Sequence, residues 1–441
     1  MESLPGRSTR WAMSFRTLVE PVVVAAQLAS ALYDTGLQMV VKERCNVTTS
    51  SNTTAPEDQQ QKAISNFYMV YNMISSFVPF LPAIFLARIG DQRRSRKIPI
   101  SVPLVGYFLS RALLLIVILF QLPIQVMFGG AILYGLGGGF SSYWAGVFSL
   151  VSERSNEAQR SLHLIRIELA YGIAGFVGSV ASGHLFMIYS YELRQGVLLV
   201  GLSVILYLFC LTYTLCVLKF PQQVPSPNNA EESNVDRCLS MSICLTFDKN
   251  IILLFAAAIL YDISVGGALE ILTSFVMKEP LSWGAAKVGY GNAFGFAIYI
   301  TSFLGVLFFS RYFRDTTMII IGIVSFGAGI FGMSFVTTTY GFFIARTLNM
   351  FALIPMPTIR SLLSKQVQGS SLGKVLISMQ LSFTLASVIY SPIFTKIYQA
   401  TLDWFAGFVF TLSFILSCLA IIPIWIVGYR TARQQGYERI S

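Results

Sequence analysis

Acidic and amide side chains recur at regular intervals within a long apolar stretch near the start of the sequence. Glu20, Gln27 and Asp34 follow one another seven residues apart, and Gln38 comes four residues after Asp34. At 3.6 residues per turn, this spacing places all four side chains within one stripe of a helix. The stripe is predicted either to face a cavity or to form hydrogen bonds to a neighbouring helix.

Charged residues also interrupt other apolar stretches. Asp262 and Glu270 share one of them, on helix faces that differ by roughly 80°, while Arg111 and Arg346 each lie within another. An ionised group in hydrocarbon is costly unless it is paired or hydrated, so each of these residues is a candidate functional residue. The two arginines either pair with these acids or bind a carboxylate or phosphate group of a substrate.

Glu168 stands in helical register with four small residues, Gly172, Gly175, Ser179 and Ser182. A seam of small residues lets a second helix approach closely, so we expect Glu168 to face protein. The carboxylate then has two possible uses. It either exchanges protons, which suits proton-coupled chemistry, or it stays in a static pair with a basic residue of another helix.

Other kinds of chemistry find little support in the sequence. The chain has only two histidines, and no two of its six cysteines have C-x-x-C spacing. We therefore predict no metal site and no cofactor. The cluster Gly135-Leu-Gly137-Gly-Gly139 does not open a nucleotide-binding strand-to-helix turn, and helix packing explains it better. The sequence favours neither an enzyme nor a nucleic-acid-binding protein.

The composition identifies lipid as the solvent of the chain. Its 441 residues are 54% hydrophobic and 12% charged, about half the charged share of a soluble domain. Runs of roughly 20 apolar residues can cross a bilayer as helices, which satisfy their own backbone hydrogen bonds. Twelve such runs are predicted, at 18–41, 66–87, 98–120, 125–151, 162–189, 196–218, 251–277, 288–310, 318–336, 341–363, 372–397 and 404–429.

The distribution of charge predicts the orientation of the chain in the membrane. Lys and Arg are in excess in the segments on one side, which places both termini in the cytoplasm by the positive-inside rule. Asn46-Val-Thr48 and Asn52-Thr-Thr54 are glycosylation sequons, and both fall in the first loop on the opposite side. We therefore expect a multi-pass glycoprotein with carbohydrate at Asn46 and Asn52.

The polar segment 219–250 divides the sequence into two parts. It has the composition of a linker and is predicted to lie in the cytoplasm. Residues 1–218 form one six-helix half, and residues 251–441 form the other, which ends in a short cytoplasmic tail. Two six-helix halves around a site at the membrane midplane are typical of the major facilitator fold. We predict an all-α membrane protein of this class with twelve transmembrane helices.

A charged segment follows the second apolar run. Asp91 is succeeded by Arg93, Arg94 and Arg96, which resembles the Asp-then-basic signature of major facilitator transporters. Asp91 either pairs with these arginines and forms a gate on the inner side, or the segment is a solvated charge run that only fixes the orientation of the chain.

Further motifs resemble one transporter family. They are Val19-Glu-Pro21, Glu279-Pro-Leu-Ser-Trp283, Val288-Gly-Tyr-Gly291, Ile300-Thr-Ser-Phe-Leu-Gly305 and Ile359-Arg360-Ser-Leu-Leu-Ser-Lys365. These segments are similar to the solute carrier 46 family, over essentially all twelve predicted helices. The resemblance implies a major facilitator fold and secondary active transport.

The resemblance also carries over individual residues. Glu168 matches a glutamate that the family's proton-coupled folate transporter uses in proton coupling, and Arg360 matches an arginine in its tenth helix. Val265 and Leu136 stand where that transporter has a histidine and an aspartate. The family implies a proton-coupled symporter at the plasma membrane that imports bulky organic anions such as bacterial muropeptides.

Alternative functions stay open at this point. Cyclic dinucleotides, sulfated steroids and folate-like molecules are other substrate classes within the family's range. A receptor or scaffold that keeps the transporter fold without moving a substrate is a different class of function. The tail sequence Tyr437-Glu-Arg-Ile440 resembles a tyrosine-based sorting signal, which predicts cycling between plasma membrane and endosomes.

Overall fold

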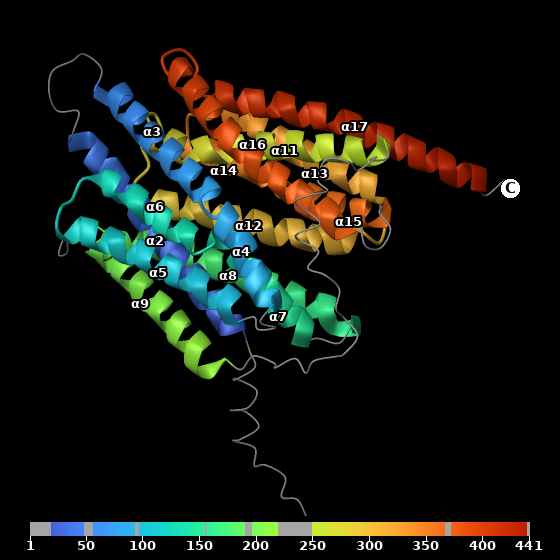
Figure 1. Cartoon of the computed structure of the whole chain (residues 1–441). Coiled ribbons are helices and arrows are strands. Elements are labelled where there is room, and N and C mark those ends of the chain that lie inside the picture. Colours follow the sequence, from blue (N-terminus) through green and yellow to red (C-terminus); the bar gives the residue numbers. More distant parts are fainter. Residues whose placement is uncertain are drawn as a thin grey trace, which may run out of the picture. The chain divides into compact units, whose positions relative to one another are not determined.

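The computed structural model of the chain describes residues 19–47, 56–92, 97–154, 157–189, 196–218, 249–366 and 372–438, which contain helices and no strand (Figure 1). The unbroken crossings are α2 (Glu20–Val47), α5 (Lys97–Leu119), α8 (Glu157–Tyr189), α11 (Lys249–Met277), α12 (Ala285–Phe309), α13 (Asp315–Ser334), α16 (Leu372–Thr401) and α17 (Phe408–Glu438). The other crossings consist of consecutive helices: α3 (Pro56–Phe77) with α4 (Phe80–Gln92), η1 (Ile124–Val126) with α6 (Met127–Leu136) and α7 (Gly139–Arg154), α9 (Val197–Thr212) with η2 (Tyr213–Val217), and α14 (Thr339–Leu348) with α15 (Pro355–Gln366).

Every predicted apolar run therefore coincides with a helix or with consecutive helices, which confirms the predicted all-α membrane protein. Nine stretches of the described residues are long and apolar enough to cross a membrane by length and composition alone. The helices outside those nine are α2, the pair α14 and α15, and α16. Two of these carry candidate site residues: α2 contains Asp34, and the pair contains Arg346 and Arg360. Charged residues lower the hydropathy of the helices that hold them.

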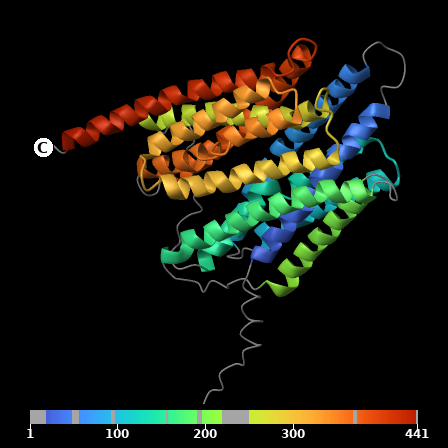
Figure 2. The same ribbon diagram turned by 180° about the vertical axis from the view of Figure 1, so that it is seen from behind.

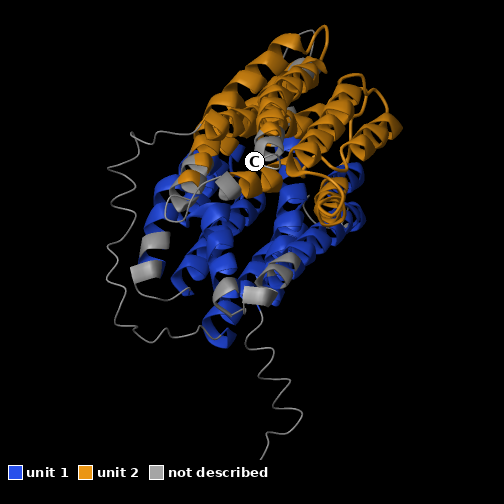
Figure 3. Cartoon of the chain, turned by 90° about the vertical axis from the view of Figure 1, so that its right-hand side faces the viewer, with its two compact units in different colours: residues 1–44, 74–230, 285–293 blue, residues 45–73, 231–284, 294–441 orange. Residues whose placement is uncertain are grey.

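The chain forms two compact units (Figure 3). Unit 1 comprises residues 1–44, 74–230 and 285–293, and unit 2 comprises residues 45–73, 231–284 and 294–441. Each unit thus contains one short helical segment from the other part of the sequence: the first part of α3 belongs to unit 2, and the start of α12 belongs to unit 1. The predicted division at 219–250 concerns the order of the helices along the chain and stays a prediction.

In unit 1, α9 packs antiparallel to α2 through a row of polar side chains. Ser203 Oγ donates to the carbonyl of Ala29 at 2.7 Å, and Tyr207 Oη donates to that of Ala26 at 3.2 Å. The row continues with the Cys210 thiol, which donates to the carbonyl of residue 22 at 3.6 Å. The side chains are spaced by four and three residues, so they form one face of α9. This face fixes the register of α9 on α2.

Two helix breaks meet within unit 1. Pro79 separates α3 from α4, and its missing N–H cannot continue the helix. Gly137 and Gly138 separate α6 from α7, and φ is +86° at Gly138 and +58° at Gly139, the first residue of α7. A Cβ built on Gly139 would lie 3.0 Å from Pro79, and one built on Gly135 would lie 2.7 Å from Val78. The glycine cluster of the sequence therefore serves close helix packing.

In unit 2, α17 lies along both α11 and α13 (Figures 1 and 2). The Ser264 hydroxyl of α11 donates to the carbonyl of Ser413 in α17 at 2.5 Å. Aromatic rings fill the interface, with Phe275 and Phe410 in edge contact at 4.9 Å. This packing leaves the opposite side of α11, where Asp262 and Glu270 lie, to face other helices of the unit.

The break between α6 and α7 should tolerate no side chain. We expect Gly138→Ala to destabilise the protein by more than the roughly 1–2 kcal/mol cost of left-handed backbone, because the new Cβ would also lie 2.8 Å from Leu86 and Ser142. Gly201→Ala is the matched control, because a Cβ there meets nothing within 4 Å. Thermal unfolding of the two purified variants in detergent measures the stability change that each substitution causes. Equal melting temperatures for the two variants would contradict this account of the break.

Candidate functional site

A cage of tyrosine rings surrounds Arg111 in unit 1. The Arg111 side chain is only 6% exposed. Its guanidinium carbon lies 4.1 Å from the ring centre of Tyr33, 4.7 Å from Tyr107, 5.4 Å from Tyr207 and 5.8 Å from Tyr134. These rings come from α2, α5, α9 and α6, so four helices position one cation. A cation–π contact of this kind stabilises a desolvated charge by about 2 kcal/mol or more.

Asp34 supplies the counter-charge of this cage. It lies on α2 next to Tyr33 and attracts Arg111 electrostatically. Its side chain is exposed, whereas its neighbours Tyr33 and Thr35 are buried. Asp34 is neither of the two acids that the sequence offered as partners of Arg111, and a substrate-binding role for Arg111 stays a prediction. A carboxylate exposed beside a buried arginine can exchange its partner for a proton or for an incoming ligand.

The amide side chains of the polar stripe on α2 were predicted either to face a cavity or to form hydrogen bonds to a neighbouring helix. Gln27 is buried, and Gln38 is half-buried and accepts a hydrogen bond from Asn292 of α12 at 3.4 Å. Asp34 alone of these three side chains is exposed. The stripe thus bonds to a neighbouring helix near Gln38, and a cavity beside Asp34 stays a prediction.

The small-residue seam of α8 is packed as predicted. Ser182 shares a hydrogen bond with Thr35 of α2 at 2.7 Å, and Ser179 and Gly172 are buried. A Cβ on Gly289 of α12 would lie 2.6 Å from the carbonyl oxygen of Ser179. Glu168 is half-buried on this helix. That Glu168 faces protein stays a prediction.

A break in the tenth crossing is the central feature of unit 2. Residues 349–354 separate α14 from α15. Thr301 and Ser302 of α12 donate to the carbonyl of Met350 at 2.8 and 2.9 Å, and the N–H of Leu353 donates to Ser302 at 3.1 Å. Ser325 of α13 donates to the carbonyl of residue 348, and Tyr261 of α11 donates to that of residue 352. Side chains of three helices thus replace the hydrogen bonds that the break removes.

Two arginines lie on either side of this break along the chain. Arg346 precedes it and is buried, while Arg360 follows it in α15 and is exposed. Asp262 of α11 is half-buried and attracts Arg360 electrostatically. Tyr390 of α16 interacts electrostatically with both Asp262 and Glu270. Arg346 and Arg360 thus flank the break along the chain, and Asp262 lies within electrostatic range of Arg360.

Glu270 belongs to a chain of polar contacts among α3, α11 and α16. Its carboxylate accepts hydrogen bonds from the Asn72 amide, at 3.3 Å, and from the Ser391 hydroxyl. Farther along α3, Gln61 donates to the Tyr398 hydroxyl at 3.1 Å. The alternative that Glu270 pairs with a buried arginine is not what the structure shows, because both of these hydrogen-bond donors are neutral.

Several of these functional side chains are absent from the sequence prediction. The tyrosine cage, Asn72, Tyr390 and Ser391 were not predicted, because tyrosine and small polar residues are common in transmembrane helices. The break at 349–354 has a signal in the sequence, since Pro355 and Pro357 interrupt an apolar run and Pro disfavours helix interiors.

The remaining predicted sites lie mostly outside the described residues. Asp91 lies in the last turn of α4, where its side chain is not described, and Arg93, Arg94 and Arg96 follow it beyond the described residues. Asn46 lies at the end of α2, and Asn52 is beyond it. Within the described part of the chain, no group of three His, Cys, Asp or Glu side chains could hold a metal ion.

Curated relatives cover nearly the whole chain. It is 46% identical to solute carrier family 46 member 2 of Canis lupus familiaris, over 98% of this chain and 97% of that protein. The corresponding protein of Mus musculus is 44% identical, over 98% of both chains. The lysosomal proton-coupled steroid conjugate and bile acid symporter SLC46A3 of Gallus gallus is 29% identical, over 93% of both. No protein-family model matches the chain.

Solved transporter structures share the fold. A mutant form of the nucleoside transporter NupG has a TM-score of 0.65 and 16% identity, over 92% of this chain and 98% of that one. A D-xylose–proton symporter has a TM-score of 0.65 and 14% identity, over 92% and 97%. The major facilitator superfamily transporter FucP has a TM-score of 0.55 and 14% identity, over 92% and 99%. These likenesses confirm the predicted major facilitator fold.

The tyrosine cage and Asp34 should act as one unit. We expect Arg111→Leu to destabilise the protein by about 2 kcal/mol through the lost cation–π contacts, and by more because Asp34 loses its counter-charge. Asp34→Asn in the same chain should restore part of that loss. Thermal unfolding of the two single variants and the double variant gives the coupling energy. Strictly additive effects would contradict the pairing.

Proposed function

The chain belongs to solute carrier family 46, and from this premise we propose that it is a secondary active transporter that imports bulky organic anions together with protons. Membrane transport is common to the family and to the major facilitator fold. The direction of transport, the class of substrate and the coupling to protons are the content of the proposal. Proton coupling is supported by a relative whose name describes a proton-coupled symporter.

One observation carries the proposal: the break in the tenth crossing lies among charged side chains. Discontinuous helices of secondary transporters place substrate and ion sites at the midplane of the membrane. Here residues 349–354 are held by side chains of α11, α12 and α13, and Asp262, Arg346 and Arg360 lie around the same helices. A receptor that only signals would have no need to keep a break and ionisable residues at this depth.

The proposal assigns roles to the candidate residues. The side chains that line the route of substrate or protons are Gln27, Asp34, Arg111, Asp262, Glu270, Arg346 and Arg360. Glu168 is the proton-responsive group, because it lies on a protein-facing seam and matches the family's coupling glutamate. The inner gate consists of Asp91, Arg93, Arg94 and Arg96. The lipid bilayer is the surrounding partner, and no cofactor takes part.

The substrate class follows the family. Bacterial muropeptides are the first candidates, because they are bulky polar anions. Sulfated steroids are supported as the alternative by the relative named as a steroid conjugate symporter, with cyclic dinucleotides and folate-like molecules as further alternatives. We place the protein in the plasma membrane with both termini in the cytoplasm, with glycans at Asn46 and Asn52 and with cycling through endosomes.

Accumulation inside sealed vesicles tests the function. Purified protein reconstituted into liposomes should concentrate a labelled muropeptide or steroid sulfate when the outer solution is more acidic than the lumen. Collapse of the pH difference with a protonophore should abolish the accumulation. Substrate that binds to the vesicles without accumulating under either condition would reject the transporter and favour a receptor.

Glu168 should control the pH dependence of uptake. We expect Glu168→Gln to flatten the dependence of the uptake rate on outer pH, because the amide cannot bind and release a proton, while surface expression changes less. Uptake at several outer pH values, divided by the amount of protein at the surface, is the measurement. Lys396→Gln, a change of a lysine that donates to the neighbouring Gln399, is the control. A wild-type pH profile in Glu168→Gln would reject the assignment.

A further inference from the structure

Arg346 is a buried cation without a counter-charge in the described part of the chain. It lies in α14, just before the break at 349–354, and is 8% exposed. Its Nε atom has no hydrogen-bond partner among the described residues. An unpaired guanidinium withdrawn from water is costly, and the cost is recovered when an anion binds.

The other arginines of the candidate site differ from Arg346 in this respect. Arg111 is held within its tyrosine cage and attracts Asp34. Arg360 attracts Asp262. Among these three arginines, Arg346 is the one whose charge no described carboxylate offsets. The geometry therefore makes Arg346 the preferred position for a negative group brought in by a ligand.

Aromatic rings form the walls next to this cation. The Phe342 ring centre lies 6.0 Å from the guanidinium carbon. Phe343 stacks on Trp283 at 5.9 Å with an angle of 19° between the rings, and Phe294 of α12 lies 5.6 Å from Phe343. Trp283 and Phe342 are buried, whereas Phe294 and Phe343 are only half-buried. The two half-buried rings leave apolar ring surface that a ligand can cover.

Gly295 keeps one side of the guanidinium open. A Cβ built on Gly295 would lie 3.2 Å from Nη2 of Arg346, closer than an ordinary van der Waals contact. Any larger side chain there would cover the nitrogen that an incoming anion needs. The half-buried ring of Phe294 precedes Gly295 on α12, so apolar surface adjoins this opening.

We propose that Arg346, Gly295, Phe294 and Phe343 form a subsite for an anionic group attached to a flat apolar ring, such as an aryl sulfonate, sulfate or carboxylate. This inference rests on the proposed function, and among the proposed substrates it favours a ring-bearing anion such as a steroid sulfate over a muropeptide. The guanidinium binds the negative group with charge-assisted hydrogen bonds, and the phenylalanine rings pack against the flat ring. Neither half of such a ligand alone satisfies the subsite.

Direct binding to the purified full-length chain tests the subsite. Naphthalene-2-sulfonate is the probe, and methanesulfonate and 2-naphthol are the comparison compounds that lack the ring or the charge. We expect calorimetric affinity for the probe to exceed that for either comparison compound at least about tenfold, because each loses one of the two interactions. Equal affinities for naphthalene-2-sulfonate and methanesulfonate would overturn the aromatic part of the proposal.

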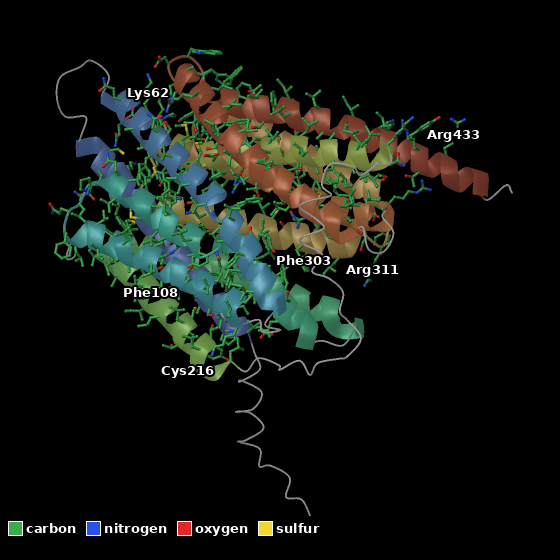
Figure 4. The ribbon with its side chains drawn as sticks, viewed as in Figure 1. Lys62, Phe108, Cys216, Phe303, Arg311 and Arg433 are labelled. Carbon is green, nitrogen blue, oxygen red and sulfur yellow. The ribbon has the colours of Figure 1, made fainter. Side chains whose placement is uncertain are left out.

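Variants separate the charge from the rings. Arg346→Gln should weaken binding of the probe about tenfold or more, and Phe343→Leu should reduce its advantage over methanesulfonate about fivefold. Arg311→Gln is the control for charge, because Arg311 is exposed and lies just beyond α12 (Figure 4). Wild-type affinity in Arg346→Gln would overturn the proposal.

A second variant covers the case in which Arg346→Gln does not fold. Gly295→Ala keeps the charge but crowds Nη2, so it should weaken binding, whereas Gly201→Ala in open space should not. Unchanged affinity in Gly295→Ala would overturn the proposal that the anion reaches Nη2 of Arg346 beside Gly295. The outcome is independent of transport: vesicles that fail to accumulate substrate reject the proposed function, while loss of probe binding in these variants still supports the subsite.

Discussion

The structure depends on one constraint: inside a bilayer there is no water to satisfy a polar group, so each one needs a partner from the protein. Residues 349–354 leave the helical hydrogen-bond pattern, and hydroxyl groups from three neighbouring helices replace what is lost. Ser302 does so twice, since its hydroxyl donates to Met350 and accepts from the N–H of Leu353. A backbone held in this way can remain non-helical among the other crossings, beside the ionisable residues of the site.

The same constraint gives two arginines opposite environments. Arg111 is surrounded by four tyrosine rings and attracts the charge of Asp34, so groups of the protein offset part of its desolvation. Arg346 has one ring at the edge of cation–π range, and no described carboxylate offsets its charge. Two arginines within membrane-spanning helices can therefore have different roles. The side chains that other helices bring to it decide whether the protein or a ligand offsets the charge.

The sequence alone predicts those features of the structure that are determined within a single helix. Apolar length predicts each crossing, and the register of Glu168 with Ser179 and Ser182 predicts the face of α8 that packs against protein. Contacts between helices distant in sequence are different. Asn72 and Ser391 approach Glu270 from α3 and α16, and nothing in the local spacing of either residue indicates the contact. Hydropathy also averages over a break such as 349–354, because the flanking residues are apolar.

Within each unit, neutral hydrogen bonds hold a helical segment to its neighbours through contacts that can open at low cost. In unit 2, the first part of α3 contacts α16 through neutral groups: Gln399 donates to Ser65 at 2.9 Å and to Asn66 at 2.8 Å. In unit 1, the start of α12 contacts α2 through the Asn292–Gln38 bond. A neutral hydrogen bond contributes only about 1 kcal/mol net, because water can replace it once it opens. A carrier has to break and remake contacts between helices in every cycle, and neutral amides at these positions keep that cost low, whereas buried ion pairs would raise it.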